Sequence, residues 1–406
     1  MIETEVMLEK DSSTPSIYSF SAHVKPAQAP KVPTLRERAG WRIQTLGELC
    51  TLQRGFDLPT VERNAGKFPL VSAGGVIDTH DAAPVIGPGV VTGRSGTIGR
   101  VFYIEEPFWP LNTTLYVRDF HGNDPRFVYY LLLSFDLKKY AGGTGVPTLN
   151  RNDVHAVPIL VPTGVAEQKR IVAILDEALD GIDVAKINTE KCLQNARAIF
   201  ESHLQAIFTR RGDGYVERQL ADVCAITSML IDPRDAKHLD LTHIGAGNIE
   251  SRTAELIGLK TAREENLISG KFLFDESMVL YSKIRPYLMK VARPNFNGLC
   301  SADMYPLAPL TDVISRDYLF YLLLSRSFTD YAIEGSARAG MPKVNREHLF
   351  QFRVWLPPLA EQKELSGVLD TLHEETKRLE EIYERKMAAL LDLKNSLLHR
   401  AFNGNI

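Results

Sequence analysis

The stretch VPTGVAEQKRIVAILDEA, residues 161–178, has a second version further along the chain, LPPLAEQKELSGVLDTL, residues 356–372. In each version AEQK closely follows a proline and precedes a long segment that contains no further proline. Proline is favoured at a helix start, where its missing N–H costs nothing, and a glutamate in the first turn stabilises the positive end of the helix dipole. Both stretches therefore predict the start of a long helix, and their repetition predicts a duplicated chain.

Further repeats occur in the same order in both halves, which is hard to attribute to chance. The paired segments are LGELC (46–50) with LADVC (220–224), FVYYLLLS (127–134) with YLFYLLLS (318–325), and GVPTLNR (145–151) with GMPKVNR (340–346). The two halves differ most between the first of these repeated segments and the aromatic segment. A constant frame with two different interiors is typical of a recognition protein with two readers, and a repeated structural domain whose interior has drifted is the alternative.

Each half is expected to form a mixed α/β module followed by a long helix, because short β-like runs alternate with Gly and Pro turns. The aromatic segments have leucines at helical spacing and predict buried helices. The predicted domains are a flexible N-terminal tail (1–38), a first module (39–161), a central helix (162–212), a second module (213–356) and a C-terminal helix (357–406).

The two long helices carry apolar residues at the alternating three- and four-residue steps of a coiled coil. The predicted seams are Ile171, Leu175, Ala178, Ile182, Ala185, Leu193, Ala196, Phe200, Leu204 and Ile207, and Leu365, Leu369, Leu372, Thr376, Leu379, Tyr383, Leu390, Leu393, Leu397 and Ala401. If they pair antiparallel, the modules are expected at opposite ends of a rod of roughly 65 Å, comparable with some 20 base pairs. The predicted fold class is α+β, with two α/β domains and an antiparallel coiled coil.

The composition limits the possible functions. Hydrophobic residues make up 44% of the 406 positions, enough for the cores of two domains, but no apolar run approaches the roughly 20 residues of a membrane span. The N-terminal segment lacks the pattern of a signal peptide, so we expect a cytoplasmic protein. A net charge of −3 argues against coating of nucleic acid by bulk electrostatics, so DNA binding requires local basic patches or basic partners.

The sequence contains none of the motifs that would indicate an enzyme. It has no G-x-x-x-x-G-K-[ST] phosphate loop, no Asn-Pro-Pro-Tyr-like methylation motif and no H-E-x-x-H metal site. Its four cysteines are scattered, without the spacing of a zinc site, and are expected to be reduced thiols. We therefore expect a protein that is not an enzyme and binds no cofactor or metal.

Candidate DNA contacts are Arg, Lys, Ser, Thr, Asn and Tyr residues near glycines or in the segments where the halves differ. They are Arg94, Ser95 and Thr97 in TGRSGT, Lys283, Arg285 and Tyr287 in YSKIRPY, the variable-segment cations Arg54, Lys67, Arg252, Lys260 and Arg263, and the repeated pairs Asn150–Arg151 and Asn345–Arg346. The alternatives are structural turns for the first two stretches, solvated surface charges for the variable cations, and helix-start residues for the Asn–Arg pairs.

Several of these motifs together resemble the specificity subunits of type I restriction-modification systems, over nearly the whole chain from about Trp41 to Ile406. They are the two AEQK helix starts, GRSGTIG (93–99), YSKIRPYL (281–288), and the helix endings FESHLQAIFTRRG (200–212) and LKNSLLHRAFNGNI (393–406). The resemblance implies two target-recognition domains that read the halves of an asymmetric split DNA sequence. The tail of residues 1–38 looks longer than this family needs.

The resemblance also implies the partners. Two methyltransferase subunits would dock on the helices, restriction and translocase subunits would join them, and S-adenosylmethionine, ATP and Mg would be bound by those partners. One rival hypothesis is a protein-interaction scaffold on a coiled coil that never touches bases; Arg94→Ala and Lys283→Ala would then leave DNA binding of the reconstituted complex unchanged. Another is a self-contained nuclease or methyltransferase, which would have to cut or modify DNA alone.

Overall fold

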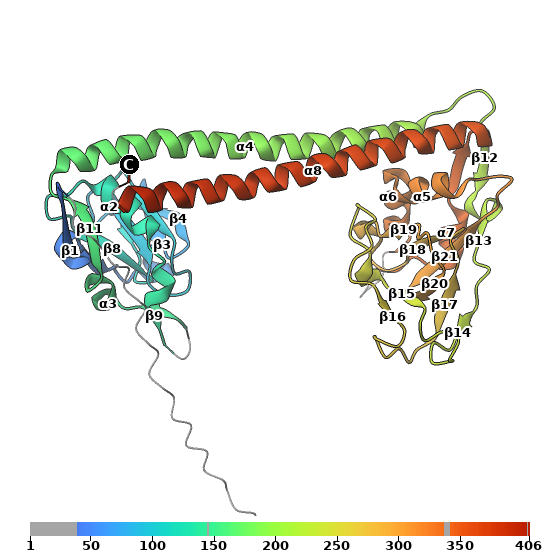
Figure 1. The fold of residues 1–406 in the computed structure, drawn as a ribbon, viewed down its shortest axis with the longest axis horizontal. Coiled ribbons are helices and arrows are strands. Elements are labelled where there is room, and N and C mark those ends of the chain that lie inside the picture. Colours follow the sequence, from blue (N-terminus) through green and yellow to red (C-terminus); the bar gives the residue numbers. More distant parts are fainter. Residues whose placement is uncertain (1–38, 144–145, 337–341, 404) are drawn as a thin grey trace, which may run out of the picture. The chain divides into compact units, whose positions relative to one another are not determined.

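The computed structural model describes residues 39–143, 146–336, 342–403 and 405–406, so the predicted N-terminal tail lies outside the described residues. The chain divides into two compact units. One runs as far as Glu177 and includes Asn395–Ile406, and the other comprises Ala178–Lys394. Each unit contains one α/β module together with a portion of both long helices (Figure 1).

The first module is built from short strands connected by turns and short helices. Its strands are β1 (Trp41–Thr45), β2 (Thr51–Arg54), β3 (Phe68–Ser72), β4 (Gly75–His80), β5 (Gly89–Gly93), β6 (Val101–Ile104), β7 (Trp109–Pro110), β8 (Thr114–Asp119), β9 (Ala141–Gly142), β10 (Thr148–Leu149) and β11 (Pro158–Pro162). Its helices are α1 (Leu46–Leu49), η1 (Thr60–Glu62), α2 (Pro125–Ser134), η2 (Leu137–Tyr140) and α3 (Arg151–His155).

The second module has the same kinds of elements. Its strands are β12 (Val216–Gln219), β13 (Cys224–Ala225), β14 (Leu230–Ile231), β15 (Thr242–Ile244), β16 (Lys260–Thr261), β17 (Lys271–Phe274), β18 (Val279–Ser282), β19 (Val291–Ala292), β20 (Gly298–Ser301), β21 (Met304–Pro309) and β22 (Arg353–Leu356). Its helices are η3 (Leu220–Asp222), η4 (Ala246–Asn248), η5 (Pro286–Leu288), α5 (Arg316–Leu324), α6 (Arg326–Glu334) and α7 (Arg346–Gln351).

The two modules share most of their sheet topology, in agreement with the duplication of the chain that the sequence predicts. The antiparallel sheet β2-β8-β5-β6 corresponds to β13-β21-β18-β19. In the sheet β4-β3-β7 the pair β3 and β7 is parallel, as is the pair β15 and β20 in β14-β17-β20-β15-β16. Strands β14 and β17 extend the second of these sheets, so they account for part of the difference between the halves.

Each module begins and ends in one two-stranded antiparallel ribbon. In the first module β1 pairs with β11, with Trp41 opposite Pro162. In the second module β12 pairs with β22, with Val216 opposite Leu356. The first and last strands of each module are therefore hydrogen-bonded neighbours, although the whole module lies between them in the sequence.

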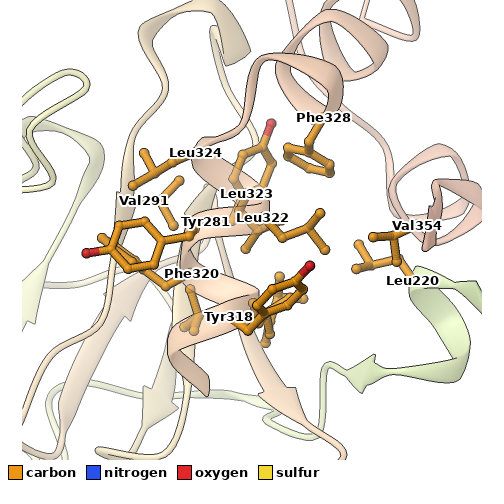
Figure 2. Close-up of a cluster of buried hydrophobic side chains, with 14 of the residues drawn as sticks. Leu220, Tyr281, Val291, Tyr318, Phe320, Leu322, Leu323, Leu324, Phe328 and Val354 are labelled. Atoms are coloured by element: carbon orange, nitrogen blue, oxygen red, sulfur yellow. The ribbon is translucent and has the colours of Figure 1, made fainter. Parts of the chain in front are cut away.

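The two aromatic segments form buried helices, which confirms their interpretation as core. Phe127 in α2 and Tyr318 in α5 are both fully buried. Figure 2 shows the side chains of α5 clustered with those of neighbouring elements, and Leu220 and Val354 lie together at one side of this cluster. Each helix has an N-cap whose side chain accepts backbone N–H groups, Asp124 before α2 and Ser315 before α5.

The long helices are α4 (Val165–Thr209) and α8 (Leu359–Phe402), and they pair antiparallel. In the second unit the Nε atom of Arg197 lies 2.6 Å from a carboxylate oxygen of Glu380, and the ring centroids of Phe200 and His373 are 5.2 Å apart. Residue numbers rise along one helix as they fall along the other, which is the antiparallel arrangement. The helices begin and end slightly inside the predicted ranges 162–212 and 357–406.

The predicted seam of α8 is buried next to the modules, and from Thr376 to Leu393 its members are half-buried or exposed. Leu369 and Ala401 are fully buried, but Leu379 and Leu393 are 37% and 48% exposed. Near the modules further side chains cover the helices, as when the ring of Phe402 packs on that of Phe127. Two helices alone have no third layer to cover their apolar residues, so the central stretch of α8 stays partly exposed.

The glutamine of each AEQK explains why the motif is repeated. Gln168 is 1% exposed, and its side-chain oxygen accepts the backbone N–H of the N-cap residue Asp124 at 2.9 Å. Gln362 is 1% exposed and accepts the backbone N–H of Ser315 at the same distance. Each glutamine thus connects a long helix to the start of an aromatic helix, a role that reasoning from the proline and glutamate alone misses.

Candidate nucleic-acid interface

The first candidate loop, TGRSGT, leaves the end of β5 in a tight turn. A Cβ at Gly93 would lie 1.9 Å from the carbonyl oxygen of Thr97, so only glycine fits at this position. The backbone N–H of Arg94 donates to the carbonyl of Thr113 at 2.8 Å, and its Nη1 donates to that of Asn112 at 3.2 Å. The backbone of Arg94 and one of the five N–H groups of its guanidinium are therefore used within the module.

Lys283 occupies the corresponding position in the second module, immediately after β18. Its backbone N–H donates to the carbonyl of Asp303 at 3.0 Å, and its ammonium donates to the carbonyl of Ala302. The Lys283 side chain is only 13% exposed, and burial lowers the pKa of its ammonium, with the charge of Lys343 acting in the same direction. The equivalent contacts of Arg94 and Lys283 favour the structural alternative for these two residues.

The predicted loops lie against the repeated Asn–Arg segments in both modules. The N–H of Leu149 donates to the carbonyl of Arg94 at 2.7 Å, and Ser95 forms a β-bridge with Thr148. The N–H of Val344 donates to the carbonyl of Lys283 at 2.8 Å, and Ile284 forms a β-bridge with Lys343. We call residues 94–97 with 148–151 the first loop pair, and residues 283–287 with 343–346 the second loop pair.

The asparagines of the loop pairs are helix caps. Asn150 accepts the backbone N–H of Asn152 at 3.0 Å, and Asn345 accepts that of His348 at 2.7 Å. The arginine that follows each cap, Arg151 or Arg346, is exposed. Neither guanidinium has a hydrogen bond or ion pair to any residue that the structure describes. The caps thus fix the backbone and leave two arginines available to bind an anion.

The second loop pair carries more positive charge than the first. Arg285 and Tyr287 are exposed, Tyr287 to 48%, and Arg285 has a positive φ of 50° at the start of η5. Lys343, two positions before Asn345, is also exposed and was missed as a candidate, although it lies inside the repeated motif. In the first loop pair Thr97 is exposed and Ser95 is half-buried. The two modules therefore share the geometry of the site and differ in its chemistry.

The variable-segment cation Arg54 is connected to the first loop pair through other polar groups. Its guanidinium lies 3.2 Å from Asp57, and the side-chain amide of Asn112 donates to the same carboxylate. Asn112 is the residue whose carbonyl accepts from Arg94. Lys67 lies elsewhere, beside β3, with its ammonium 5.1 Å from the centroid of the Phe68 ring.

The variable cations of the second module are exposed, and two of them have acidic partners. Arg252 lies 3.7 Å from Glu201 of α4, and Arg263 lies 3.0 Å from Asp240. Lys260 is in β16, where it pairs with His243 of β15. No contact between these three cations and the second loop pair is found among the described residues. The ion pair with Glu201 places Arg252 beside α4.

The parts of the chain that the structure describes contain no group of three or more His, Cys, Asp or Glu side chains that could hold a metal ion. Within the same ranges, no helix combines the length and the apolar character needed to cross a bilayer. Cys50, Cys224 and Cys300 are buried, and burial raises the pKa of each thiol to about 12. These thiols are therefore protonated and poorly reactive at neutral pH.

Comparisons with known proteins place both modules in one family. The model of the type I restriction modification DNA specificity domain matches residues 38–193 and again residues 212–384. A specificity subunit of the type I restriction enzyme EcoDI from Escherichia coli is 26% identical, over 90% of this chain and 88% of that protein.

Two solved structures share the fold. A chain of a type I R-M system, from a study of its complex assembly and conformational transition, superposes with a TM-score of 0.71 at 16% identity, covering 91% of this chain and all of that one. The HsdS subunit from Thermoanaerobacter tengcongensis superposes with a TM-score of 0.54 at 19% identity, covering 92% of this chain and all of that one. These likenesses support the duplicated modules and paired helices described above.

Proposed function

The chain belongs to the type I restriction modification DNA specificity family, and from this premise we propose that it selects one asymmetric, bipartite DNA sequence for a partner methyltransferase. The observation that carries this proposal is the duplicated loop pair. In both modules an exposed arginine directly follows a helix N-cap and lies beside a loop that contains Gly or Pro. The side chains around the two arginines differ. One frame with two chemistries is what two different half-sites require.

We propose that the loop pairs make the contacts with DNA. Arg151 and Arg346 are exposed and face no acidic partner among the described residues, so they can bind phosphate or a guanine edge without first breaking an ion pair. Arg285, Tyr287 and Lys343 add two cations and an aromatic hydroxyl in the second loop pair. The net charge of −3 implies that basic surfaces on partner subunits supply the rest of the affinity.

We further propose that the long helices set the number of unread base pairs between the half-sites. α4 contains 45 residues and α8 contains 44. At about 1.5 Å per residue each helix is about 66–68 Å long, comparable with about 20 base pairs. A helix is rigid over this length when it is paired with another, so a fixed helix length gives a fixed gap.

The central part of the paired helices is proposed to dock two methyltransferase subunits, which restriction and translocase subunits then join. Apolar side chains at least 37% exposed lie here, a composition typical of subunit interfaces. They are Val184, Ile187 and Ile199 on α4 and Leu379, Ile382, Leu391 and Leu393 on α8. S-adenosylmethionine, ATP and Mg would be bound by these partners, and the assembly would act in the cytoplasm on chromosomal DNA.

The experiment that tests the proposed function is a genome-wide methylation map. Cells that express this chain with its neighbouring methyltransferase are compared with cells that lack only this chain. We expect a split, asymmetric methylated motif that disappears in the second strain. An unchanged map from an assembled complex would contradict the proposal and favour the protein-interaction scaffold.

A further inference from the structure

A part-buried polar contact joins the aromatic helix of the first module to α4. The hydroxyl of Tyr130, which is 4% exposed, donates to the carboxylate of Asp176. The Nε of Arg126 donates to the same oxygen at 2.7 Å. Burial and the neighbouring carboxylate raise the pKa of Tyr130, so its hydroxyl keeps the proton that it donates.

The second module contains the same contact, built partly from different residues. The hydroxyl of Tyr321, which is fully buried, donates to Asp370 of α8 at 2.6 Å. The arginine here is Arg293, which follows β19 rather than lying in the aromatic helix, and its guanidinium also donates to Asp370. The tyrosine and aspartate are thus duplicated, whereas the arginine reaches the carboxylate from another element.

The spacing of these contacts is the same in both modules. On the long helix, eight positions separate the glutamine of AEQK from the aspartate, Gln168 from Asp176 and Gln362 from Asp370. On the aromatic segment, six positions separate the N-cap from the tyrosine, Asp124 from Tyr130 and Ser315 from Tyr321. In each module two hydrogen bonds, one from the N-cap backbone to the glutamine and one from the tyrosine to the aspartate, therefore connect the aromatic helix to the long helix at two separate points.

Two points of attachment fix both the translation and the rotation of one helix against the other. The apolar contacts around them are non-directional and tolerate small displacements. A displacement that broke the polar contacts would leave the buried tyrosine hydroxyl and the buried glutamine amide without partners, which is unfavourable. Setting the register of packed helices is the best-attested use of buried polar groups.

We propose that Tyr130–Asp176 and Tyr321–Asp370 are positioning contacts that restrict the complex to a single gap length between the two half-sites. This inference rests on the proposed function, because it assigns the accuracy of the spacing to these residues. A module free to shift by one residue along its helix would move by about 1.5 Å, an appreciable part of the roughly 3.4 Å between base pairs. Loss of the contact should therefore widen the range of accepted gaps without changing the bases read.

The test uses the full chain assembled with its neighbouring methyltransferase and a pool of DNA targets. Each target carries both half-sites from the methylation map, with the mapped gap or a gap one or two base pairs longer or shorter. The variants are Tyr321→Phe, Tyr130→Phe and Asp370→Asn. For Tyr321→Phe we expect methylation at the neighbouring gaps, relative to the mapped gap, to rise at least about fivefold while the half-site bases stay the same. Tyr130→Phe should give a smaller rise, because Arg126 of the same aromatic helix still donates to Asp176.

The matched control is Tyr318→Phe. Tyr318 is in the same helix as Tyr321 and is equally buried, but its hydroxyl has no hydrogen-bond partner among the described residues. Tyr318→Phe should therefore keep the single gap. Thermal unfolding of every variant separates a loss of stability from a loss of positioning, and if Asp370→Asn fails to fold, Tyr321→Phe still removes only one oxygen atom.

A single accepted gap for Tyr321→Phe and Tyr130→Phe, with only a lower unfolding temperature, would overturn the inference and leave the contacts a purely stabilising role. Equal broadening in Tyr318→Phe would overturn it as well. Failure of the proposed function would look different, because the unsubstituted complex would then show no bipartite methylated motif at any gap.

Discussion

Replacing Arg346 by alanine should reduce the dependence of DNA binding on salt, because the exposed guanidinium would no longer displace a counterion from a phosphate. Each phosphate contact contributes about 0.9 to the slope of log affinity against log salt concentration. One lost contact therefore makes the fall in affinity between about 50 and 200 mM salt roughly 3.5-fold smaller. The measurement is fluorescence anisotropy of the reconstituted complex on its mapped target over a series of salt concentrations.

The comparison that gives this prediction its force is Lys283→Met in the same loop pair. Lys283 is 13% exposed and its ammonium donates to the carbonyl of Ala302, so its charge faces the module. Removing it should leave the salt slope unchanged. It should also lower the free energy of unfolding by about 0.5–1.5 kcal/mol, the usual net contribution of one hydrogen bond, because the contact with Ala302 is only part-buried.

A reversed result would refute this reasoning. If Lys283→Met lowered the salt slope by about one and Arg346→Ala left it unchanged, the internal hydrogen bond of Lys283 would not survive in the complex with DNA, and the roles assigned from exposure would be wrong. The same pair of measurements applies to the first loop pair, with Arg151→Ala as the contact variant and Arg94→Met as the anchor variant.

Three further predictions test the helices, the core and the first loop. Inserting one helical turn at matched points of α4 and α8 should lengthen the unread gap between the half-sites by one or two base pairs, since four residues add about 6 Å. Altered half-site bases in the methylation map would contradict this. Iodoacetamide should rapidly alkylate Cys192, which is exposed, whereas mass spectrometry should find the other three thiols, with pKa values raised by burial to about 12, unmodified in the native protein. Gly93→Ala should lower the free energy of unfolding by about 1–3 kcal/mol, because its Cβ would meet the carbonyl of Thr97 at 1.9 Å; an unchanged denaturation midpoint would show that the turn relaxes.

The elements that could be predicted from the sequence are those whose signal is local and repeated. Nearby residues alone produce the signals of the helix starts, with their proline and glutamate, and of the aromatic segments, with their leucines. The repeated segments can be recognised by their order in the two halves. The exposed centre of α8 could not be predicted in this way. Leu379 follows the same three- and four-residue pattern as Leu369, and only the presence or absence of a covering module distinguishes them.

In the candidate site, too, the features that depend on neighbouring residues could be predicted and those that depend on distant contacts could not. The sequence offers helix-start residues as one interpretation of the two asparagines, because capping depends on three or four neighbouring positions. The different roles of Lys283 and Arg346 depend on Ala302 and on the bridge between Ile284 and Lys343, contacts between segments far apart in the chain. A cation beside a glycine or proline has the same sequence signal whether its charge faces solvent or a carbonyl of its own module.

The ribbons formed by β1 with β11 and by β12 with β22 have a consequence for how such a protein changes over generations. Because the chain enters and leaves each module at adjacent, hydrogen-bonded strands, the interior can be exchanged as a cassette without moving the two ends. The Gln and Tyr–Asp contacts then meet any incoming cassette that retains the N-cap and the tyrosine six positions later. Recombination at the ribbon would thus bring in a module that recognises a different half-site, while the assembly of the complex stays unchanged.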